Sequence, residues 1–458
     1  MDNWFSSIFG DFDLNSKNQN KMKFLLYCLF LPTVFSTRNF FIGTATSSYQ
    51  IEGSNVGESI WDRYTSTHHL HDVGNATNFY HTYKDDIKMM YDLGFTHFRL
   101  SISWTRIMPF EYGILNQEGI QFYHNVIDTC LSYNITPYVT LYHWDLPQYI
   151  DEQYDGWLHE SIVPLFLEYS KLMFQEFGFK VKHWMTINEP LTTSNQGYGQ
   201  ACNFAPGKCS DKNRYTSARN QLLAHATVGN YYKKHYDGDI GIVLNSNWIE
   251  PMNPQSRYHA KFQMDDSLGL FLQPLLDGKF PSSIEHRITP FSAHQKEMMK
   301  DSFTFIGINH YTSYIVNELG EISTSPDWFQ AQSSWLYDAP RGISELMYYL
   351  RDYYHVEFPI LITECGFSQK NDGLVDLERV HYLSGYINQV LECIRNGMTN
   401  IEGFFVWSLL DNFEWSSGYN ETFGIVHVDF EKNYQRTPKL SARFIKEYLN
   451  NFINYRRV

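Results

Sequence analysis

Apolar stretches rich in β-branched and aromatic residues recur eight times along the chain, and most of them are apolar at nearly every position. Uninterrupted apolar stretches are typical of strands that are buried on both faces of a parallel sheet, whereas half-exposed strands alternate. The pattern therefore predicts eight buried strands. They cover residues 40–50, 97–104, 138–144, 183–189, 240–248, 303–311, 358–364 and 402–410.

Amphipathic segments lie between several of these strands. Apolar residues recur at intervals of three and four over residues 120–130, 162–177 and 380–394, which predicts helices with one buried face. Strands that alternate with such helices form a parallel sheet with the helices outside. Because eight strands follow one another without a linker, we expect one α/β domain over residues 37–458, a (β/α)8 TIM barrel rather than an open doubly wound sheet.

The barrel prediction brings particular side chains together, since catalytic groups in this fold lie at the carboxyl ends of the strands. The predicted strand ends carry polar or aromatic residues, although the strand interiors are mostly aliphatic. A barrel that needed only stability would not require that difference. These residues are Gln50, Trp104, His143, Trp144, Asn188, Glu189, Asn247, Asn309, Tyr311, Glu364 and Trp407.

A short apolar segment near the amino terminus predicts secretion. Residues 24–35 are largely apolar, follow a basic residue and lead into small or β-branched residues, as a secretory signal does. The segment is too short to span a bilayer, so we expect no membrane anchor. We interpret residues 1–36 as a leader with a signal peptide and expect an extracellular protein. The alternative is an apolar helix that packs on the barrel.

Composition and cysteine spacing limit the partners and the chemistry. The formal net charge is −14 and no cluster of Lys and Arg occurs, so we expect no nucleic-acid partner. Neither CxxC nor HExxH occurs, so we expect no metal site. Secretion permits disulfides, and Cys202 and Cys209 flank a turn-rich loop that a disulfide would close. Asn75 begins a glycosylation sequon in a polar stretch.

Two of the predicted strands end in glutamate. Glu189 ends the fourth strand and Glu364 the seventh, so both carboxylates would face one barrel mouth. Two carboxylates flanking a sugar perform glycoside hydrolysis, one as an acid and one as an anion. We expect aromatic surroundings to favour the acid form of Glu189 and the Tyr311 hydroxyl to favour the anion of Glu364. Alternatively, each glutamate is an ion-pair partner, for example of Arg99.

Ordered sequence blocks carry a resemblance to a known family. The blocks GTATSSYQIEG, FRLSISWTRIMP, TLYHWDLPQ, TINEP, FIGINHYTS, LITECGFS and FFVWSLLDNFEW follow one another between residues 38 and 450. In this order they resemble glycoside hydrolase family 1, the β-glucosidase family, in the manner of its animal or insect members. The resemblance implies a (β/α)8 barrel, a small-molecule β-glycoside substrate, a retaining double displacement, and no metal or cofactor.

The resemblance also implies a role for each matching residue. Glu189 would be the general acid/base and Glu364 the nucleophile, and Asn188 would bind the sugar 2-hydroxyl. Tyr311 and Arg99 would hold Glu364 in place. Most of the other matching residues would bind the hydroxyl groups and faces of the glycone, with an indole as the floor of the pocket. Gln50, His143, Glu414 and Trp415 would bind the hydroxyl groups of the glycone, Trp407 would be the floor, and Trp144 would line the same pocket. Asn309 would be a supporting residue.

The substrate stays open at this point. No Lys or Arg follows Glu414 in WSSGYNETFG, so the resemblance implies an unphosphorylated glycone such as glucose, galactose or fucose. A β-thioglucosidase that cleaves glucosinolates is one alternative. A catalytically inactive, klotho-like binding protein is another, although such relatives lose one catalytic glutamate. Several mouth loops depart from the family pattern, so the aglycone is open, and the sequence fits a monomer or a homodimer.

Cys365 follows Glu364 at a position where the family usually has asparagine. Because successive side chains of a strand point in opposite directions, Cys365 is expected to face away from the sugar that Glu364 faces. We therefore predict that Cys365→Asn keeps turnover of an aryl β-glucoside within about tenfold of wild type, or about 1.4 kcal/mol of barrier. A larger loss would place the thiol in the site.

Overall fold

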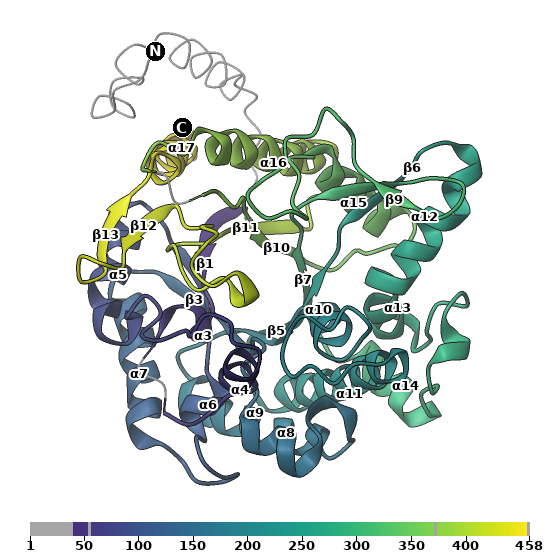
Figure 1. Ribbon diagram of the computed structural model, residues 1–458, viewed down its shortest axis with the longest axis horizontal. Helices are drawn as coiled ribbons and strands as arrows, with labels where there is room; N and C mark the ends of the chain where they lie inside the picture. The colour runs from purple at the N-terminus through teal and green to yellow at the C-terminus, as the bar shows by residue number, and fades with distance from the viewer. Residues whose placement is uncertain (1–39, 54–55, 371–372, 456–458) are drawn as a thin grey trace.

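The computed structural model describes residues 40–53, 56–370 and 373–455, and these residues form a closed barrel (Figure 1). Its eight parallel strands follow the order β1–β2–β3–β4–β5–β7–β10–β11, and β11 pairs back with β1. The eight predicted strands and the TIM barrel are confirmed. The barrel strands are β1 (Phe41–Ala45), β2 (His97–Ser101), β3 (Thr136–Tyr142), β4 (His183–Asn188), β5 (Asp239–Asn245), β7 (Phe305–Asn309), β10 (Ile360–Cys365) and β11 (Ile401–Trp407).

Helices surround the barrel on its outside (Figure 1). The three helices predicted from apolar periodicity are α7, α9 and α16, and the predicted apolar residues are among those that each helix buries. The longer outer helices are α5 (Phe79–Asp92), α7 (Gln117–Ser132), α9 (Ile162–Phe177), α11 (Asp211–His235), α15 (Arg341–Asp352), α16 (Leu377–Arg395) and α17 (Leu440–Tyr455). Shorter helices are α3 (Ser48–Ile51), α4 (Ile60–Thr67), α6 (Trp104–Ile107), α8 (Gln148–Tyr154), α10 (Pro190–Thr192), α12 (Arg257–Met264), α13 (Leu270–Asp277) and α14 (Ala293–Lys300).

Several predicted strands extend past the strand ends in the structure, and for the first and second strands this changes which element carries the last predicted residue. The first strand ends at Ala45, and Gln50 lies on α3 instead. The second ends at Ser101, because the Ser103 hydroxyl accepts from the Arg106 backbone and starts α6 there. Trp104 is fully buried on α6 and stacks on Tyr169 of α9 at 4.6 Å. Trp104 therefore belongs to the core and not to the barrel mouth.

Aromatic side chains fill the amino end of the barrel. Phe41 stacks on His97 at 3.7 Å, and Tyr138 stacks on His183 at 4.3 Å. The Phe405 ring meets Phe41 edge-on at 5.3 Å and Tyr138 at 5.2 Å. Such rings contribute large buried area and leave little room for a ligand. The open, polar end of the barrel is therefore its carboxyl end.

Two small sheets lie outside the barrel. One contains β6 (Trp248–Pro251), β8 (Ser313–Val316) and β9 (Ile322–Ser323), and the other pairs β12 (Val426–Asp429) with β13 (Gln435–Pro438). Among the described residues, no helix is both long and apolar enough to cross a membrane. The predicted leader and signal peptide, residues 1–36, lie outside the described residues.

His225 of α11 makes the stability of the barrel depend on pH. Its ring lies between the hydroxyls of Thr186, at 2.7 Å, and Ser302, at 3.2 Å, and burial lowers its pKa to about 3. An unfolded histidine titrates near ~6.5. Between about pH 6.5 and pH 3, His225 is therefore protonated in the unfolded chain and neutral in the folded chain. The stability that is present above about pH 6.5 is lost as the pH falls toward 3. We expect His225→Gln to reduce this slope when urea midpoints are compared between pH 7 and pH 5. An unchanged slope would contradict the assignment.

Candidate active site

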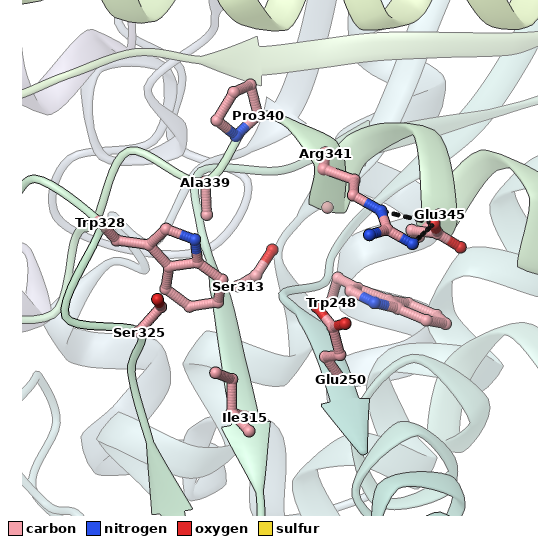
Figure 2. A pocket seen from close by; sticks show the side chains of 11 residues that line it. Trp248, Glu250, Ser313, Ile315, Ser325, Trp328, Ala339, Pro340, Arg341 and Glu345 are labelled. Atoms are coloured by element: carbon pink, nitrogen blue, oxygen red, sulfur yellow. Dashed lines mark hydrogen bonds and ion pairs between the residues drawn. The ribbon is translucent and has the colours of Figure 1, made fainter. Parts of the chain in front are cut away.

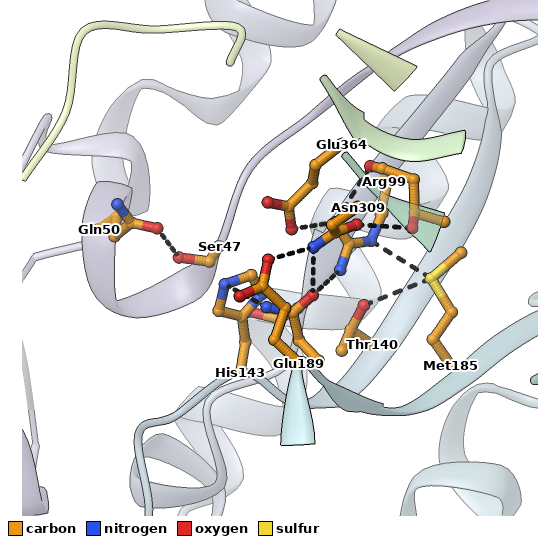
Figure 3. Close-up of polar contacts among 12 residues, drawn as sticks. Ser47, Gln50, Arg99, Thr140, His143, Met185, Glu189, Asn309 and Glu364 are labelled. Carbon is orange, nitrogen blue, oxygen red and sulfur yellow. Dashed lines mark hydrogen bonds and ion pairs between the residues drawn. The ribbon is translucent and has the colours of Figure 1, made fainter. Parts of the chain in front are cut away.

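Glu189 and Glu364 lie at the carboxyl end of the barrel, as their places at the strand ends predicted (Figure 3). Glu189 directly follows β4, and Glu364 lies near the end of β10. Both side chains are buried, with exposed fractions of 7% and 4%. Between their strands, Asn309 ends β7, and its Nδ2 donates to Glu189 Oε1 at 2.7 Å while its Oδ1 accepts from Thr363 at 2.7 Å. The two glutamates therefore share one mouth.

The Glu189 carboxyl is surrounded by neutral donors. Besides Asn309, the Thr192 hydroxyl donates to its Oε2 at 2.6 Å, and Asn245 in turn donates to Thr192 at 2.9 Å. Burial, and next the charge of Glu364, raise the pKa of Glu189 to about 7. At neutral pH a carboxyl with that pKa is protonated in a large fraction of molecules. It can donate a proton and, once ionised, accept one.

The Glu364 carboxylate is held by a cation and a phenol. The buried guanidinium of Arg99 forms an ion pair with its Oε1, and the Tyr311 hydroxyl donates to its Oε2 at 2.8 Å. The same guanidinium donates to Asn188 Oδ1 at 2.7 Å. Charge-assisted hydrogen bonds of this kind stabilise an anion. The expected contacts of Arg99 and Tyr311 with Glu364 are therefore present, and the surroundings of the two glutamates differ in charge.

Asn188, His143 and Trp144 form one hydrogen-bonded unit beside the glutamates. Asn188 Nδ2 lies 3.1 Å from His143 Nε2, and Trp144 Nε1 donates to the Asn188 carbonyl oxygen at 2.9 Å. Burial, and next the charge of Arg99, hold the pKa of His143 well below its usual range, so the ring is neutral. Its buried Nδ1 has no partner among the described residues. A neutral ring that accepts at Nε2 carries its proton at Nδ1.

Gln50 and Glu414 meet at another part of the mouth. Gln50 Nε2 donates to the Phe413 carbonyl oxygen at 2.8 Å and to Glu414 Oε2 at 3.3 Å, while Ser47 donates to its Oε1 at 2.7 Å. Burial raises the pKa of Glu414 well above its usual range, and the charges of Glu421 and Glu364 add to this effect. Both amide and carboxyl can exchange hydrogen bonds with a polar ligand.

Indole rings form a wall at the mouth. His143 is nearly parallel to Trp407 at 5.9 Å and to Trp415 at 6.1 Å, and Trp144 lies 4.6 Å from Trp415. Trp144 and Trp415 adopt left-handed backbone conformations, with φ of 73° and 46°, and Glu189 does so as well, with φ of 46°. Such conformations are uncommon for large side chains and cluster at functional sites.

Several residues of the site were not predicted from the sequence. Thr192 and Asn245 orient Glu189, Thr363 orients Asn309, and Asn412 accepts from Gln50 Nε2 at 3.0 Å. Thr192, Thr363 and Asn412 lie within three positions of predicted site residues in the chain. That proximity was a usable signal. For Asn245, the only signal in the sequence was its place at the end of a strand, β5.

Two further predictions concern the surface. Cys202 and Cys209 are joined by a disulfide in the structure, with 5.6 Å between their Cα atoms. Asn75 is exposed in a turn, so its side chain is accessible.

Cys365 is fully buried and its thiol points to Tyr382 of α16, away from the mouth, as strand alternation predicted.

A hollow also lies away from the barrel mouth, between the β6–β8–β9 sheet and the start of α15 (Figure 2). Its volume is about 330 Å³, and Trp248, Ser313 and Trp328 contribute to its lining. Arg341 and Glu345, at its edge, pair with each other at 2.9 Å. None of the mouth residues described above lines this hollow. It is therefore separate from the glutamate pair.

The comparison with known families shows which kind of chemistry this barrel mouth serves. The sequence profile of glycosyl hydrolase family 1 matches residues 33–452. The chain belongs to glycosyl hydrolase family 1. The fold agrees, because a rice β-glucosidase, Os3BGlu6, has a TM-score of 0.85 and 36% identity, covering 89% of this chain and 97% of its own. The chain is thus a glycoside hydrolase, and the carboxyl-rich mouth is the natural place for its chemistry.

Relatives within family 1 support β-glycosidase activity. β-Glucosidase 25 of Oryza sativa subsp. japonica is 38% identical, over 90% of this chain and 93% of its own length. β-Glucosidase 42 of Arabidopsis thaliana is also 38% identical, over 93% and 97%. An aphid myrosinase structure has a TM-score of 0.84 and 31% identity, covering 90% of this chain and 98% of its own. These relatives come from plants and an insect, so they do not single out an animal-like member.

Proposed function

We propose that this protein is a retaining β-glucosidase in which Glu364 is the nucleophile and Glu189 the general acid/base. The opposite surroundings of the two glutamates carry the proposal. Glu364 is paired with the Arg99 cation, whereas burial and a neighbouring charge raise the pKa of Glu189 to about 7. A retaining glycosidase needs one anion and one proton donor at the same sugar.

The proposed reaction has two displacements. Glu364 attacks the anomeric carbon, and the bond to the leaving oxygen breaks as Glu189 gives that oxygen its proton. The product is an ester between the sugar and Glu364, with Glu189 now ionised. Water then loses a proton to Glu189 as it attacks the same carbon, and the ester bond breaks to restore both groups. Arg99 and Tyr311, which contact Glu364, receive the carboxylate when it leaves.

A rice relative supports the covalent step. The structure of the rice Os3BGlu6 β-glucosidase, which is 35% identical, includes a Glu→Gln mutant in a covalent complex with Glc from GA4GE. The alternative of an inactive binding protein is disfavoured because both glutamates are present. Turnover of p-nitrophenyl β-glucoside by the purified protein tests this point. A wild-type protein that is inert on every aryl β-glycoside contradicts the proposal.

We propose an unphosphorylated glycone. Gln50 donates a hydrogen bond to Glu414 at the mouth. Burial, and next the charges of neighbouring carboxyls, raise the pKa of Glu414, so the surroundings disfavour further negative charge. A phosphate brings nearly two such charges. We expect kcat/KM for p-nitrophenyl β-glucoside to exceed that for its 6-phosphate by at least about 100-fold, equal to about 2.7 kcal/mol. Equal rates with both substrates would contradict this assignment.

We propose cleavage of O-glucosides ahead of thioglucosides. In the same structural comparison, the rice β-glucosidase is 36% identical and the aphid myrosinase is 31% identical. Both groups share the barrel, so the choice depends on the aglycone loops. Initial rates with cellobiose, salicin and a glucosinolate at equal concentration discriminate between them. A glucosinolate hydrolysed faster than both O-glucosides would overturn this preference.

We also propose an extracellular location, on the basis of the apolar segment at residues 24–35 and the disulfide-bonded pair Cys202 and Cys209. Expression of the full chain in a secreting cell tests this. We expect protein in the medium, with a mass that an endoglycosidase lowers and that Asn75→Gln lowers to the same extent. Protein retained in the cytosol would contradict the location.

A further inference from the structure

Two tyrosines of α16 hold the backbone of Tyr311 from behind the active site. The Tyr382 hydroxyl donates to the Tyr311 carbonyl oxygen at 2.6 Å, and the Tyr386 hydroxyl donates to the same oxygen at 2.9 Å. A carbonyl oxygen has two lone pairs, and the two phenols use both. Tyr382 and Tyr386 are fully buried, lie one helical turn apart, and stack at 4.1 Å between ring centroids. The contact is therefore shielded from water.

Cys365 supports the pair from the strand that carries Glu364. Its thiol donates to the Tyr382 hydroxyl, with 3.6 Å between sulfur and oxygen. Burial raises the pKa of the Cys365 thiol, so it keeps its proton at neutral pH and remains a donor. Strand β10 thus reaches Tyr311 on two sides. Glu364 accepts from its phenol inside the mouth, and Cys365 touches the tyrosine that holds its backbone.

We propose that Tyr382 and Tyr386 are positioning residues, which act on Glu364 through Tyr311 and are supported by Cys365. They are fully buried behind Tyr311, so their effect is to fix where its phenol lies relative to Glu364 Oε2. A hydrogen bond weakens steeply as its geometry worsens. A misplacement of about 1 Å near a reacting group can cost about 100-fold in rate. The inference rests on the proposed role of Glu364 as nucleophile.

A purely structural role for the two tyrosines makes a different prediction. In that case they only attach α16 to the loop after β7, and their loss would affect the enzyme whether or not Tyr311 has a hydroxyl. If they act through the Tyr311 phenol, their loss has no further effect once that phenol is absent. Non-additivity in a mutant cycle separates these two roles.

The test compares four full-length proteins: wild type, the double variant Tyr382→Phe/Tyr386→Phe, Tyr311→Phe, and the triple variant. Each is assayed for kcat and KM on p-nitrophenyl β-glucoside and for the rate of covalent inactivation by a 2-deoxy-2-fluoroglucoside. We expect the double variant to lower kcat and the inactivation rate about tenfold, with KM within about twofold. In the Tyr311→Phe background the same change should alter these rates less than about twofold.

A matched control removes a similar contact elsewhere in the barrel. The Tyr169 hydroxyl, on α9, donates to the Leu141 carbonyl oxygen at 3.0 Å, and that carbonyl belongs to a strand held by its own ladder. We expect Tyr169→Phe to lower the urea midpoint but to keep kcat within about twofold. If the double variant does not fold, Tyr386→Phe alone is compared in the same two backgrounds.

The outcomes are distinct. Equal losses with and without the Tyr311 hydroxyl, or no loss in either background, would overturn the positioning role while the enzyme remains active. A wild-type protein without turnover or inactivation would overturn the proposed function, and the positioning role with it. A loss confined to the proteins that keep the Tyr311 hydroxyl supports the inference.

Discussion

Replacing Glu364 with glutamine is expected to lower kcat on p-nitrophenyl β-glucoside by at least about 10⁴-fold, or about 5.5 kcal/mol of barrier. Glutamine keeps the size of the side chain, but its neutral oxygen is too weak a nucleophile to form the glycosyl ester. The change also leaves the buried Arg99 guanidinium without its anion. An unpaired buried charge costs about 3–5 kcal/mol of folding stability. The stability of the Glu364→Gln variant must therefore be measured by an unfolding curve along with its steady-state kinetics.

A matched control separates lost chemistry from lost stability. Glu52 is also a buried glutamate paired with an arginine, Arg106, at 2.8 Å. We expect Glu52→Gln to lose a similar amount of stability and to keep kcat within about tenfold. For a second check, Glu364→Gly leaves space for a small anion, and added azide or formate should restore turnover. A folded Glu364→Gln protein with wild-type kcat would contradict the assignment.

Replacing Glu189 with glutamine is expected to have an effect that depends on the leaving group. An alcohol leaving group needs the proton of Glu189, and general acids typically contribute about 10²–10⁴-fold to a rate. We therefore expect kcat/KM on cellobiose to fall by about 10³-fold or more. A dinitrophenolate leaves without protonation, so kcat/KM on dinitrophenyl β-glucoside should fall less than about tenfold. Comparing the two substrates on the same preparation makes the variant its own folding control. Equal losses on both would contradict an acid role.

The same residue sets the pH dependence of the wild-type enzyme. Burial and the charge of Glu364 raise the pKa of Glu189 to about 7. Because the acid form is the active one in the first displacement, kcat/KM should be high below about pH 7 and fall as the pH rises through that value. Glutamine does not titrate in this range, so the fall should disappear in Glu189→Gln. A basic limb retained in that variant would show that another group causes it.

Much of the fold was predictable because it rests on local pattern. Apolar runs of strand length specified all eight barrel strands, since a strand buried on both faces is apolar at most of its positions. Helices such as α9 were visible from spacing because one face of each packs on the sheet. The strand limits were less certain. A capping serine, Ser103, ended one strand early and left Trp104 to pack in the core, which an apolar run does not reveal.

The site was predictable in outline and not in its contacts. Strand ends placed Glu189 and Glu364 at one mouth, and alternation placed Cys365 behind its strand. The hydrogen-bond partners of each carboxyl depend on how neighbouring strands are staggered in three dimensions, which the sequence does not show. Asn309 reaches Glu189 from β7 for that reason, and Tyr382 meets Cys365 from a helix. The raised pKa of Glu189 follows from its burial and next from the charge of Glu364, whereas the hydrogen bonds from Thr192 and Asn309 lower it. The sequence predicted the direction of this shift but not these contacts.

The most direct test of the account is to identify the residue that carries the sugar. Wild-type protein is incubated with a 2-deoxy-2-fluoroglucoside, which forms the ester readily but releases it slowly, and is then digested and analysed by mass spectrometry. We expect one fluoroglucosyl group per chain, on the peptide that contains Glu364, and none on Glu364→Gln. A label on Glu189, or on neither glutamate while the enzyme turns over, would contradict it.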